Sequence, residues 1–243
     1  MYFVKDFFDI VNRDGIRVLL LDFDGTLIDY RVAEYHAIRD VLVNWGVRDI
    51  EAAARRYNII NEGLWARFRK GELDAASIRS LRFKMLFDEL EIDRDPLRSN
   101  SEYLESFIFH SKVEPDVLEG IQRLKESGYS LMVLTNGFHD TQRRRLEQSG
   151  LLRYLDGYLT SEQVSSPKPA PAMFERALKK FSAFPHEALM VGDSLEADIG
   201  GASALGIPSI LIGDGMPDVP PLPHAVFPDF PGFVSFWLGD DFS

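Results

Sequence analysis

The amino-acid sequence predicts an α/β protein, a doubly wound parallel sheet with an all-helical segment inserted into it. The first observation is a set of short, unbroken apolar runs, each ending in a turn or polar cluster, at residues 17–21, 130–134, 188–191 and 208–212. Continuous rather than alternating hydrophobicity is typical of strands buried on both faces, as in parallel sheets. The second is that helical patterns alternate with these runs, which indicates βαβ units.

The helices expected between these strands have recognisable ends. They cover residues 116–127, 139–149, 170–181 and 195–205. Gly128, Gly150 and Gly206 each follow a helical run, where glycine commonly ends a helix. The proline-rich tail, from about residue 217, is expected to wrap the sheet domain as an ordered loop.

One long segment, from about residue 31 to about residue 110, shows no strand pattern. Apolar residues recur there at three- and four-residue spacing, which predicts helices at 32–45, 50–69, 75–90 and 101–109. Turn signals separate them at Gly46, Gly71 and Asp95-Pro96. We expect most of the aromatic residues on these helices to pack in a helical core, namely Trp45, Tyr57, Trp65, Phe68 and Phe83.

Composition excludes several classes of function. The 243 residues are 45% hydrophobic and 27% charged, as in ordinary globular proteins. A net charge of −11 argues against a nucleic-acid polymer as partner. The absence of cysteine excludes disulfides, a thiolate nucleophile and Cys-ligated zinc. The N-terminus lacks the pattern of a signal peptide, so we expect a cytoplasmic protein, monomer or homodimer, without a membrane partner.

The most suggestive polar residues follow the expected strands. Ligands of open parallel sheets bind at the carboxyl ends of the strands. The residues at three such ends are Asp22 and Asp24, then Thr135 and Asn136, then Asp193. Lys168 stands between two prolines, just before an expected helix. We therefore expect these side chains to converge at one edge of the sheet.

This combination favours the chemistry of phosphate with a metal ion. A carboxylate cluster repels an anionic substrate unless a cation intervenes, and without His or Cys it favours Mg²⁺. Lys168 and the Thr135 hydroxyl could then neutralise and position a phosphoryl group. Each residue alone has an ordinary explanation as turn former or helix cap, so their convergence carries the argument.

The order of these motifs resembles that of the haloacid dehalogenase superfamily over essentially the whole chain. The motifs are Asp22-Phe23-Asp24-Gly25-Thr26-Leu27, Thr135-Asn136-Gly137, Lys168-Pro169, and Gly192-Asp193-Ser194 with Asp198. The resemblance implies a Rossmann-like catalytic core at residues 1–29 and 111–243, with a C1-type helical cap at residues 30–110. Dehalogenase members lack an acid two positions after the nucleophile, so Asp24 places the resemblance with the phosphatases.

The resemblance also implies roles for single residues. Asp22 would be the nucleophile that forms an aspartyl-phosphate, and Asp24 the general acid and base. Lys168 would stabilise the charge of the nucleophile and the phosphoryl group. Phosphate oxygens would be bound by the turn Thr135, Asn136 and Gly137.

The resemblance further implies a Mg²⁺ cofactor. The ion would be held by the carboxylates of Asp22 and Asp193 and by the backbone carbonyl of Asp24. Asp198 would orient the lysine and water rather than touch the metal, and Ser194 would support the site from behind these ligands. Arg143-Arg144-Arg145, on the helix after the second motif, is interpreted as exposed surface.

The core segment 134–156, with Ser161-Glu162 and Phe174, is similar to the pyrimidine 5′-nucleotidase and N-acylneuraminate-9-phosphatase branch. This implies a small phosphorylated metabolite, a nucleoside monophosphate or a sugar phosphate, as partner. Alternatives are a phosphomutase of the β-phosphoglucomutase kind, a phosphoglycolate phosphatase, and a non-catalytic binding module. The presence of Asp22, Asp24, Lys168 and Asp193 argues against the binding module.

Overall fold

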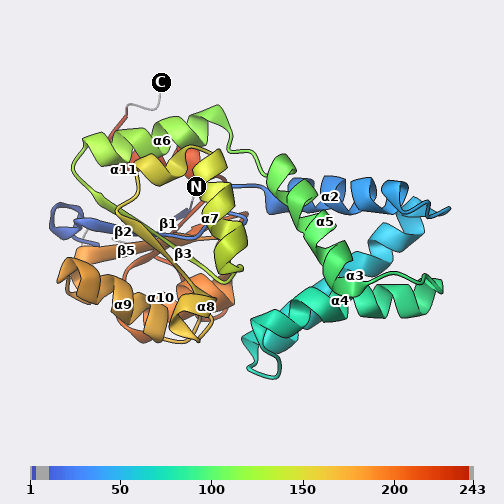
Figure 1. Ribbon diagram of the computed structural model, residues 1–243. Helices are drawn as coiled ribbons and strands as arrows, with labels where there is room; N and C mark the ends of the chain where they lie inside the picture. The colour runs from blue at the N-terminus through green and yellow to red at the C-terminus, as the bar shows by residue number, and fades with distance from the viewer. Residues whose placement is uncertain (1, 4–10, 241–243) are drawn as a thin grey trace. The chain divides into compact units, whose positions relative to one another are not determined.

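The computed structural model describes residues 2–3 and 11–240 (Figure 1). The chain divides into two compact units, one built from the segments 1–28 and 113–243 and the other from residues 29–112. The first unit contains the sheet and the second is helical.

Within the described residues the sheet unit has seven strands, arranged as the sequence pattern predicts for a doubly wound fold. In chain order they are β1 (Tyr2–Phe3), β2 (Val18–Leu21), β3 (Ser130–Thr135), β4 (Gly157–Thr160), β5 (Ala188–Gly192), β6 (Ser209–Ile212) and β7 (Ala225–Phe227). Their order in the sheet is β1-β7-β6-β5-β2-β3-β4. β2 to β7 pair in parallel, and β1 adds an antiparallel edge. Because β3 and β5 both flank β2, the strand order reverses beside β2, where such sheets bind ligands.

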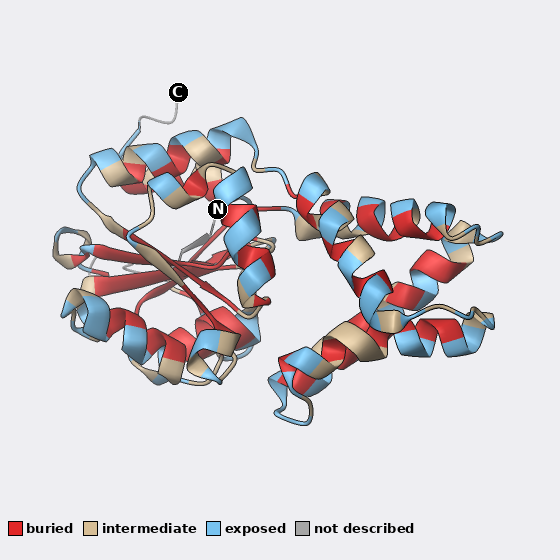
Figure 2. Cartoon of the chain, viewed as in Figure 1, coloured by how far each residue is buried: buried red, intermediate tan, exposed pale blue. Residues whose placement is uncertain are grey.

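Helices cover both faces of this sheet (Figure 1). One face carries α6 (Pro115–Glu126), α7 (His139–Gln148) and α11 (Phe230–Leu238), and the other carries α9 (Ala172–Phe181) and α10 (Gly201–Ala204). Leu19 packs with the first set, whereas the next residue, Leu20, packs with the second. Figure 2 shows strands buried in the middle of the sheet, and β2 and β5 are buried along their whole length, which explains why their sequences are apolar without alternation.

Shorter helical segments complete the sheet unit. They are the 3₁₀ turns η1 (Arg13–Gly15), η2 (Leu151–Arg153) and η3 (Pro185–Glu187), the short α8 (Ser161–Val164), and the π-helical η4 (Leu195–Gly200). The single helix predicted for residues 195–205 is therefore η4 followed by α10. At its start the amides of Asp198 and Ile199 both donate to the carbonyl of Ser194, which widens the turn.

The prediction that the tail is a loop was wrong for residues 225–238. β7 and α11 lie there, with Pro228 just past the strand and Pro231 in the first turn of the helix. Proline is tolerated in that turn because its missing N–H has no intrahelical partner, and Asp229 caps the helix by accepting from the amide of Gly232 at 2.7 Å. The proline count therefore concealed two regular elements.

The helical unit consists of α2 (Tyr30–Asn44), α3 (Ile50–Arg69), α4 (Ala75–Leu90) and α5 (Pro96–His110). Each begins after an aspartate whose side chain accepts from a backbone amide of the first turn; these caps are Asp29, Asp49, Asp74 and Asp95. α5 starts at Pro96 rather than at residue 101 as predicted. Asp95-Pro96 is a cap followed by a first-turn proline, which is a helix start as well as a turn signal.

The centre of the helical unit is aromatic. Tyr57 and Phe83 are buried with their ring centroids 5.4 Å apart, and Tyr103 packs against both. Phe68 is buried too, which confirms the packing expected for these predicted core residues. The buried guanidinium of Arg82 lies 4.6 Å from the ring centroid of Tyr103. This unit therefore has a core of its own.

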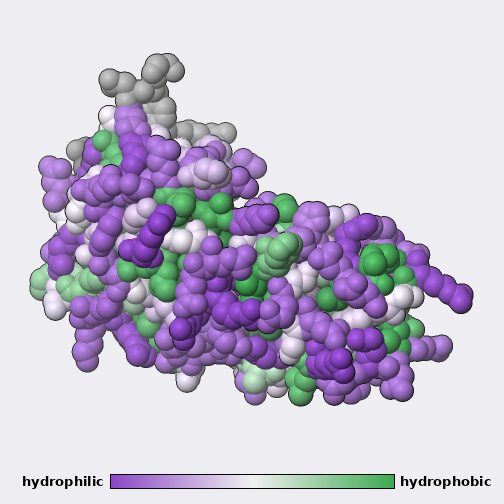
Figure 3. Space-filling model, turned by 45° about the horizontal axis from the view of Figure 1, so that its top comes forward, coloured by the Kyte–Doolittle hydropathy of each residue, from purple (hydrophilic) through white to green (hydrophobic). Residues whose placement is uncertain are grey.

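Figure 3 shows a mostly hydrophilic surface on the visible face, with small hydrophobic areas between polar ones. Among the helices of the described ranges, none combines the length and apolar character that crossing a membrane requires.

Candidate active site

The strand register brings the predicted residues to one edge of the sheet. Leu21, the last residue of β2, pairs with Val133 of β3 and with Val191 of β5. Asp22 follows directly, is buried, and donates its backbone N–H to the carbonyl of Val191. The residues just beyond Val133 and Val191 thus flank Asp22, which is why Thr135 and Asp193 lie near it although far away in sequence.

Lys168 lies at the centre of this edge with its side chain 2% exposed. Its ammonium donates to Oδ1 of Asp22, to Oδ1 of Asp198 and to the carbonyl of Leu134, each at 2.6 Å, which accounts for all three N–H groups. Burial alone lowers the pKa of Lys168, but the charges of Asp198 and Asp22 outweigh it and raise the pKa. The lysine therefore stays positively charged between the two acids.

Asn136 holds the loop that carries Lys168. Its Nδ2 donates to the backbone carbonyl of Lys168 at 3.0 Å, and its Oδ1 accepts from the backbone N–H of Lys168 at 2.8 Å. Ser161 Oγ donates to the carbonyl of Asn136 at 3.0 Å. The side chain predicted to bind phosphate is thus engaged in positioning the lysine.

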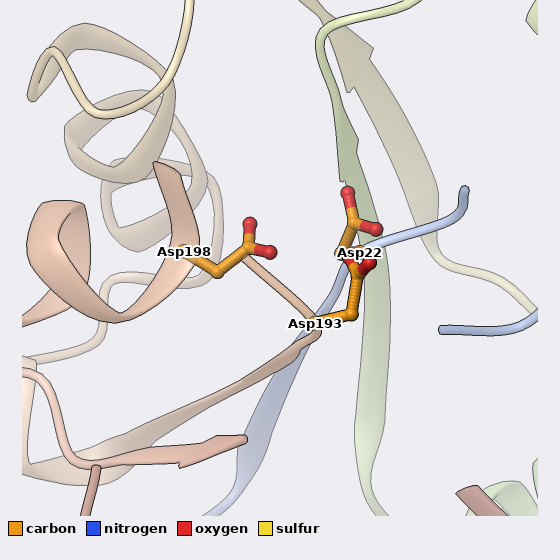
Figure 4. A group of neighbouring side chains, drawn as sticks. All are labelled: Asp22, Asp193 and Asp198. Carbon is orange, nitrogen blue, oxygen red and sulfur yellow. The ribbon is translucent and has the colours of Figure 1, made fainter. Parts of the chain in front are cut away.

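Three carboxylates converge at the ends of β2 and β5 and on η4 (Figure 4). One oxygen of each of Asp22, Asp193 and Asp198 lies within 4.8 Å of the others. Burial, with repulsion from Asp198 and Asp193, raises the pKa of Asp22 despite the attraction of Lys168. Burial and then Asp198 raise the pKa of Asp193 to about 6.

This donor set fits a hard divalent cation. All three groups are carboxylates, and burial together with mutual repulsion, which a cation would relieve, raises the pKa of Asp22 and of Asp193. Gly25 has φ +98°, and a Cβ there would overlap the carboxylate of Asp193. Glycine is therefore required where Asp193 closes on the turn after Asp22.

Asp198 and Ser194 form the support behind the cluster. Asp198 is buried, with Oδ1 on Lys168 and Oδ2 accepting from the backbone N–H of Ser194 at 3.0 Å. Ser194 Oγ accepts from the amide of Ala197 at 3.1 Å and so caps η4. Both oxygens of Asp198 are thus engaged by protein groups.

Asp24 has a separate set of partners. Its side chain is 26% exposed, with Oδ1 2.6 Å from Nη1 of Arg145 and Oδ2 accepting from Nε2 of Gln142 at 2.6 Å. The interpretation of residues 143–145 as exposed surface was wrong for Arg145, whose side chain is 1% exposed. Arg143 is exposed as expected and pairs with Glu147.

Gln142 and Arg145 were missed, although helical periodicity contained the signal. On α7 they share the buried face with Leu146, at spacings of three and four residues. When one of three consecutive arginines falls on the buried face of a helix, that arginine cannot be exposed to solvent.

Thr135 and Gly137 complete the turn after β3. The buried Thr135 Oγ1 accepts from the amide of Gly137 at 3.1 Å and from Nε2 of Gln142 at 2.8 Å. With both acceptor positions used, the hydroxyl proton of Thr135 is the group it has to offer a ligand oxygen. The predicted site residues therefore meet at the carboxyl ends of β2, β3 and β5.

Known proteins resemble this chain in sequence and in fold. The model of the haloacid dehalogenase-like hydrolases matches residues 16–206. The chain belongs to this hydrolase family. This match confirms the expected superfamily. The expected enzyme class is confirmed as well, because relatives of this hydrolase are named as phosphatases and nucleotidases.

Three relatives illustrate the match. Pyrimidine 5′-nucleotidase PynA of Streptococcus pneumoniae is 33% identical over 80% of this chain and 82% of its own length. HAD-hydrolase YfnB of Bacillus subtilis is 29% identical over 84% of this chain and 87% of its own length. Its magnesium-bound crystal structure aligns with a TM-score of 0.80 at 26% identity and covers 91% of this chain and 98% of that one. Phosphoserine phosphatase of Thermus thermophilus is 27% identical over 83% and 90%.

Proposed function

We propose that this haloacid dehalogenase-like hydrolase is a Mg²⁺-dependent phosphatase that cleaves a small phosphate monoester through an aspartyl-phosphate on Asp22. The observation that carries the proposal is the pair of aspartates after β2. Asp22 is buried against Lys168, whereas Asp24 is partly exposed and held by other partners. This difference supports Asp22 as the acid that attacks phosphorus and Asp24 as the acid that transfers protons.

The magnesium ion would be held by the carboxylates of Asp22 and Asp193 and by the backbone carbonyl of Asp24. When bound, it would offset the negative charge of the substrate and of the carboxylates around it. The clustered oxygens, and magnesium in the structure of YfnB, support this assignment. Asp198, engaged by Lys168 and Ser194, orients the lysine.

In the first step an oxygen of Asp22 attacks phosphorus, and the bond from phosphorus to the leaving oxygen breaks. Asp24 donates a proton to that oxygen, so the alcohol leaves neutral. Thr135 donates a hydrogen bond from its hydroxyl to a phosphate oxygen, and the turn at Gly137 lies beside the phosphate. Lys168 stabilises the negative charge.

In the second step water attacks the phosphorus of the aspartyl-phosphate. Asp24 takes a proton from this water, which regenerates its acid form. The bond from phosphorus to Asp22 breaks, and inorganic phosphate is released with the Asp22 carboxylate restored.

We propose a nucleoside monophosphate or a sugar phosphate as substrate, and a cap role for residues 30–110. The names of relatives such as PynA and the phosphoserine phosphatase support small phosphorylated metabolites. Specificity in this proposal belongs to the helical unit, which has its own core and can vary in surface without disturbing the sheet.

The test is phosphate release from a panel of nucleoside monophosphates, sugar phosphates and phosphoglycolate, with Mg²⁺ or with EDTA. We expect release only with Mg²⁺, a loss of at least about 10³-fold in kcat for Asp22→Asn, and no change for the control Asp14→Asn. Asp14 is exposed in η1, at the opposite end of β2.

Two results would contradict the proposal. Hydrolysis that survives both EDTA and Asp22→Asn would exclude the aspartyl-phosphate route. Phosphoryl transfer that needs a bisphosphate primer, without net phosphate release, would identify a phosphomutase instead.

A further inference from the structure

Two buried polar residues of α7, Gln142 and Arg145, contact Asp24. We propose that they are positioning residues, which hold the Asp24 carboxylate in place for proton transfer to the leaving oxygen. This inference rests on the proposed function, in which Asp24 is the general acid and base.

The three side chains form a closed set of contacts, made of two hydrogen bonds and one ion pair. Nη1 of Arg145 lies 2.6 Å from Oδ1 of Asp24 and donates to Oε1 of Gln142 at 2.7 Å, while Nε2 of Gln142 donates to Oδ2 of Asp24 at 2.6 Å. A guanidinium only donates and a carboxylate only accepts, so the amide of Gln142 has one workable orientation. Each oxygen of Asp24 therefore lies against a different side chain, Oδ2 in a hydrogen bond with Gln142 and Oδ1 in an ion pair with Arg145, which restricts how the carboxylate can turn.

The burial of the two donors differs from that of the acid they hold. Arg145 and Gln142 are each 1% exposed, whereas the side chain of Asp24 is 26% exposed. The guanidinium carbon lies 4.8 Å from the ring centroid of Phe23, the residue between the two catalytic aspartates. Asp24 is thus held by buried side chains, while part of its own surface remains open to a substrate.

A stabilising role alone would not account for this arrangement. The desolvation free energy of burying a charged pair often equals the electrostatic free energy that the pair gains. Apolar residues of similar size would therefore stabilise the fold equally well. Arginine supplies instead a planar guanidinium whose positive charge is permanent. Lys168 pairs with Asp22, and Arg145 pairs with Asp24. Each acid is therefore oriented by a cation of its own.

Gln142 also links Asp24 to the phosphate-binding turn. Its Nε2 donates to Oγ1 of Thr135 at 2.8 Å as well as to Asp24. A Cβ at Gly137 would overlap this amide, so the glycine of the Thr-Asn-Gly turn leaves the space that Gln142 occupies. Arg145 lies next to the acid and the amide, so its replacement tests the hold on Asp24 more directly than that of Gln142 does.

The experiment compares two leaving groups in the first turnover. p-Nitrophenolate departs without protonation, whereas the alkoxide of an alkyl phosphate needs the proton of Asp24. Asp24 also serves hydrolysis of the intermediate, so leaving-group release is measured by rapid quench before that step. Arg145→Met should slow release from the alkyl phosphate about 10- to 100-fold and from p-nitrophenyl phosphate less than about threefold.

Matched variants separate positioning from general damage. Arg145→Lys keeps the charge and should recover part of the loss, while Arg143→Met, on the exposed face of the same helix, should behave as wild type. In an Asp24→Asn background, Arg145→Met should have no further effect on the alkyl phosphate, because the group it positions is gone. Should Arg145→Met not fold, as judged by circular dichroism, Gln142→Leu carries the same comparison.

Equal losses for both leaving groups, or a full additional loss in the Asp24→Asn background, would overturn the inference while leaving the phosphatase assignment intact. A wild-type protein that hydrolyses neither substrate with Mg²⁺ would overturn the proposed function and the inference with it. A selective loss on the alkyl phosphate supports both.

Discussion

Two aspartates separated by a single residue occupy different surroundings in this protein. Asp22 is buried beside Lys168, and the charges of Asp198 and Asp193 add to burial in raising its pKa. Asp24 lies at the surface of the site and is held by Arg145. Two like groups in unlike environments are the usual means by which one site performs two tasks.

At the residue scale, Gly25→Ala should weaken magnesium binding. The new Cβ would displace the Asp193 carboxylate, and φ +98° adds backbone strain. We expect the Mg²⁺ concentration for half-maximal activity to rise at least about tenfold, the equivalent of about 1.4 kcal/mol.

The matched control is Gly71→Ala, which has φ +73° but nothing within 4 Å of the added Cβ. It bears backbone strain alone and should leave the Mg²⁺ requirement unchanged. An equal rise in the Mg²⁺ concentration for half-maximal activity in both variants would show that backbone strain, rather than the position of Asp193, determines Mg²⁺ binding.

At the scale of elements, the parallel register of β2, β3 and β5 assembles the site, and the helices on both faces hold that register. α11 belongs to this support because Phe233 and Trp237 are buried against the sheet. The tail that was expected to be a loop is therefore part of the core on which the strands rest.

The contribution of α11 can be measured with Phe233→Ala. Phe233 is fully buried and packs against Phe227 and Phe230, so its truncation should lower the free energy of unfolding by about 3–5 kcal/mol. The same change at Phe184, which is 66% exposed, should cost less than about 0.5 kcal/mol. Urea unfolding of both variants decides this, and equal costs would refute the assigned role of α11.

A second link between elements depends on pH. Burial opposes ionisation of Asp156, but hydrogen bonds from Lys125 of α6 and from the amide of Leu131 in β3 outweigh it and lower the pKa of Asp156. A lowered folded-state pKa stabilises the protein above the unfolded value of about 3.9, and that contribution is lost as pH falls through the folded value.

Asp156→Asn should therefore be less stable than wild type at pH 7, and the difference should shrink as pH falls below about 4. Urea unfolding at pH 7, 5, 4 and 3 measures this. Asp88→Asn, in an exposed pair with Lys84, is the control and should differ little from wild type at any of these pH values. A constant difference for Asp156→Asn across this range would contradict the assignment.

At the scale of the whole molecule, an acidic protein gathers three carboxylates at one edge of its sheet. The net charge is −11. Burial is the larger cause, and repulsion within the cluster the smaller one, of the rise in the pKa of Asp193 to about 6. A magnesium ion bound only by the folded chain would then stabilise the entire sheet unit through linkage.

We expect Mg²⁺ at about 100 times its Kd to raise the free energy of unfolding by about 2.7 kcal/mol, seen as a higher Tm. Asp193→Asn should lose most of this increase, whereas Asp14→Asn should retain it. An equal increase in wild type and Asp193→Asn would show that the ion binds elsewhere.

Much of the fold was predictable because local patterns report burial directly. Runs such as 18–21 and 188–191 are apolar without alternation since both of their faces are covered. The edge strand β4 was missed because only its last two residues are buried. In the tail, the prolines of residues 217–231 were given more weight than the apolar residues that follow Pro228.

The sequence by itself determined the α/β class, the helical insert and the acids at the strand ends, because these follow from neighbours along the chain. Only the tertiary structure decided which cation each acid receives. Lys168 comes to Asp22 from 146 residues away, and Gln142, with Arg145, reaches Asp24 from a helix 118 residues on. Such pairings depend on strand order and on the buried face of α7, and neither is encoded in local spacing.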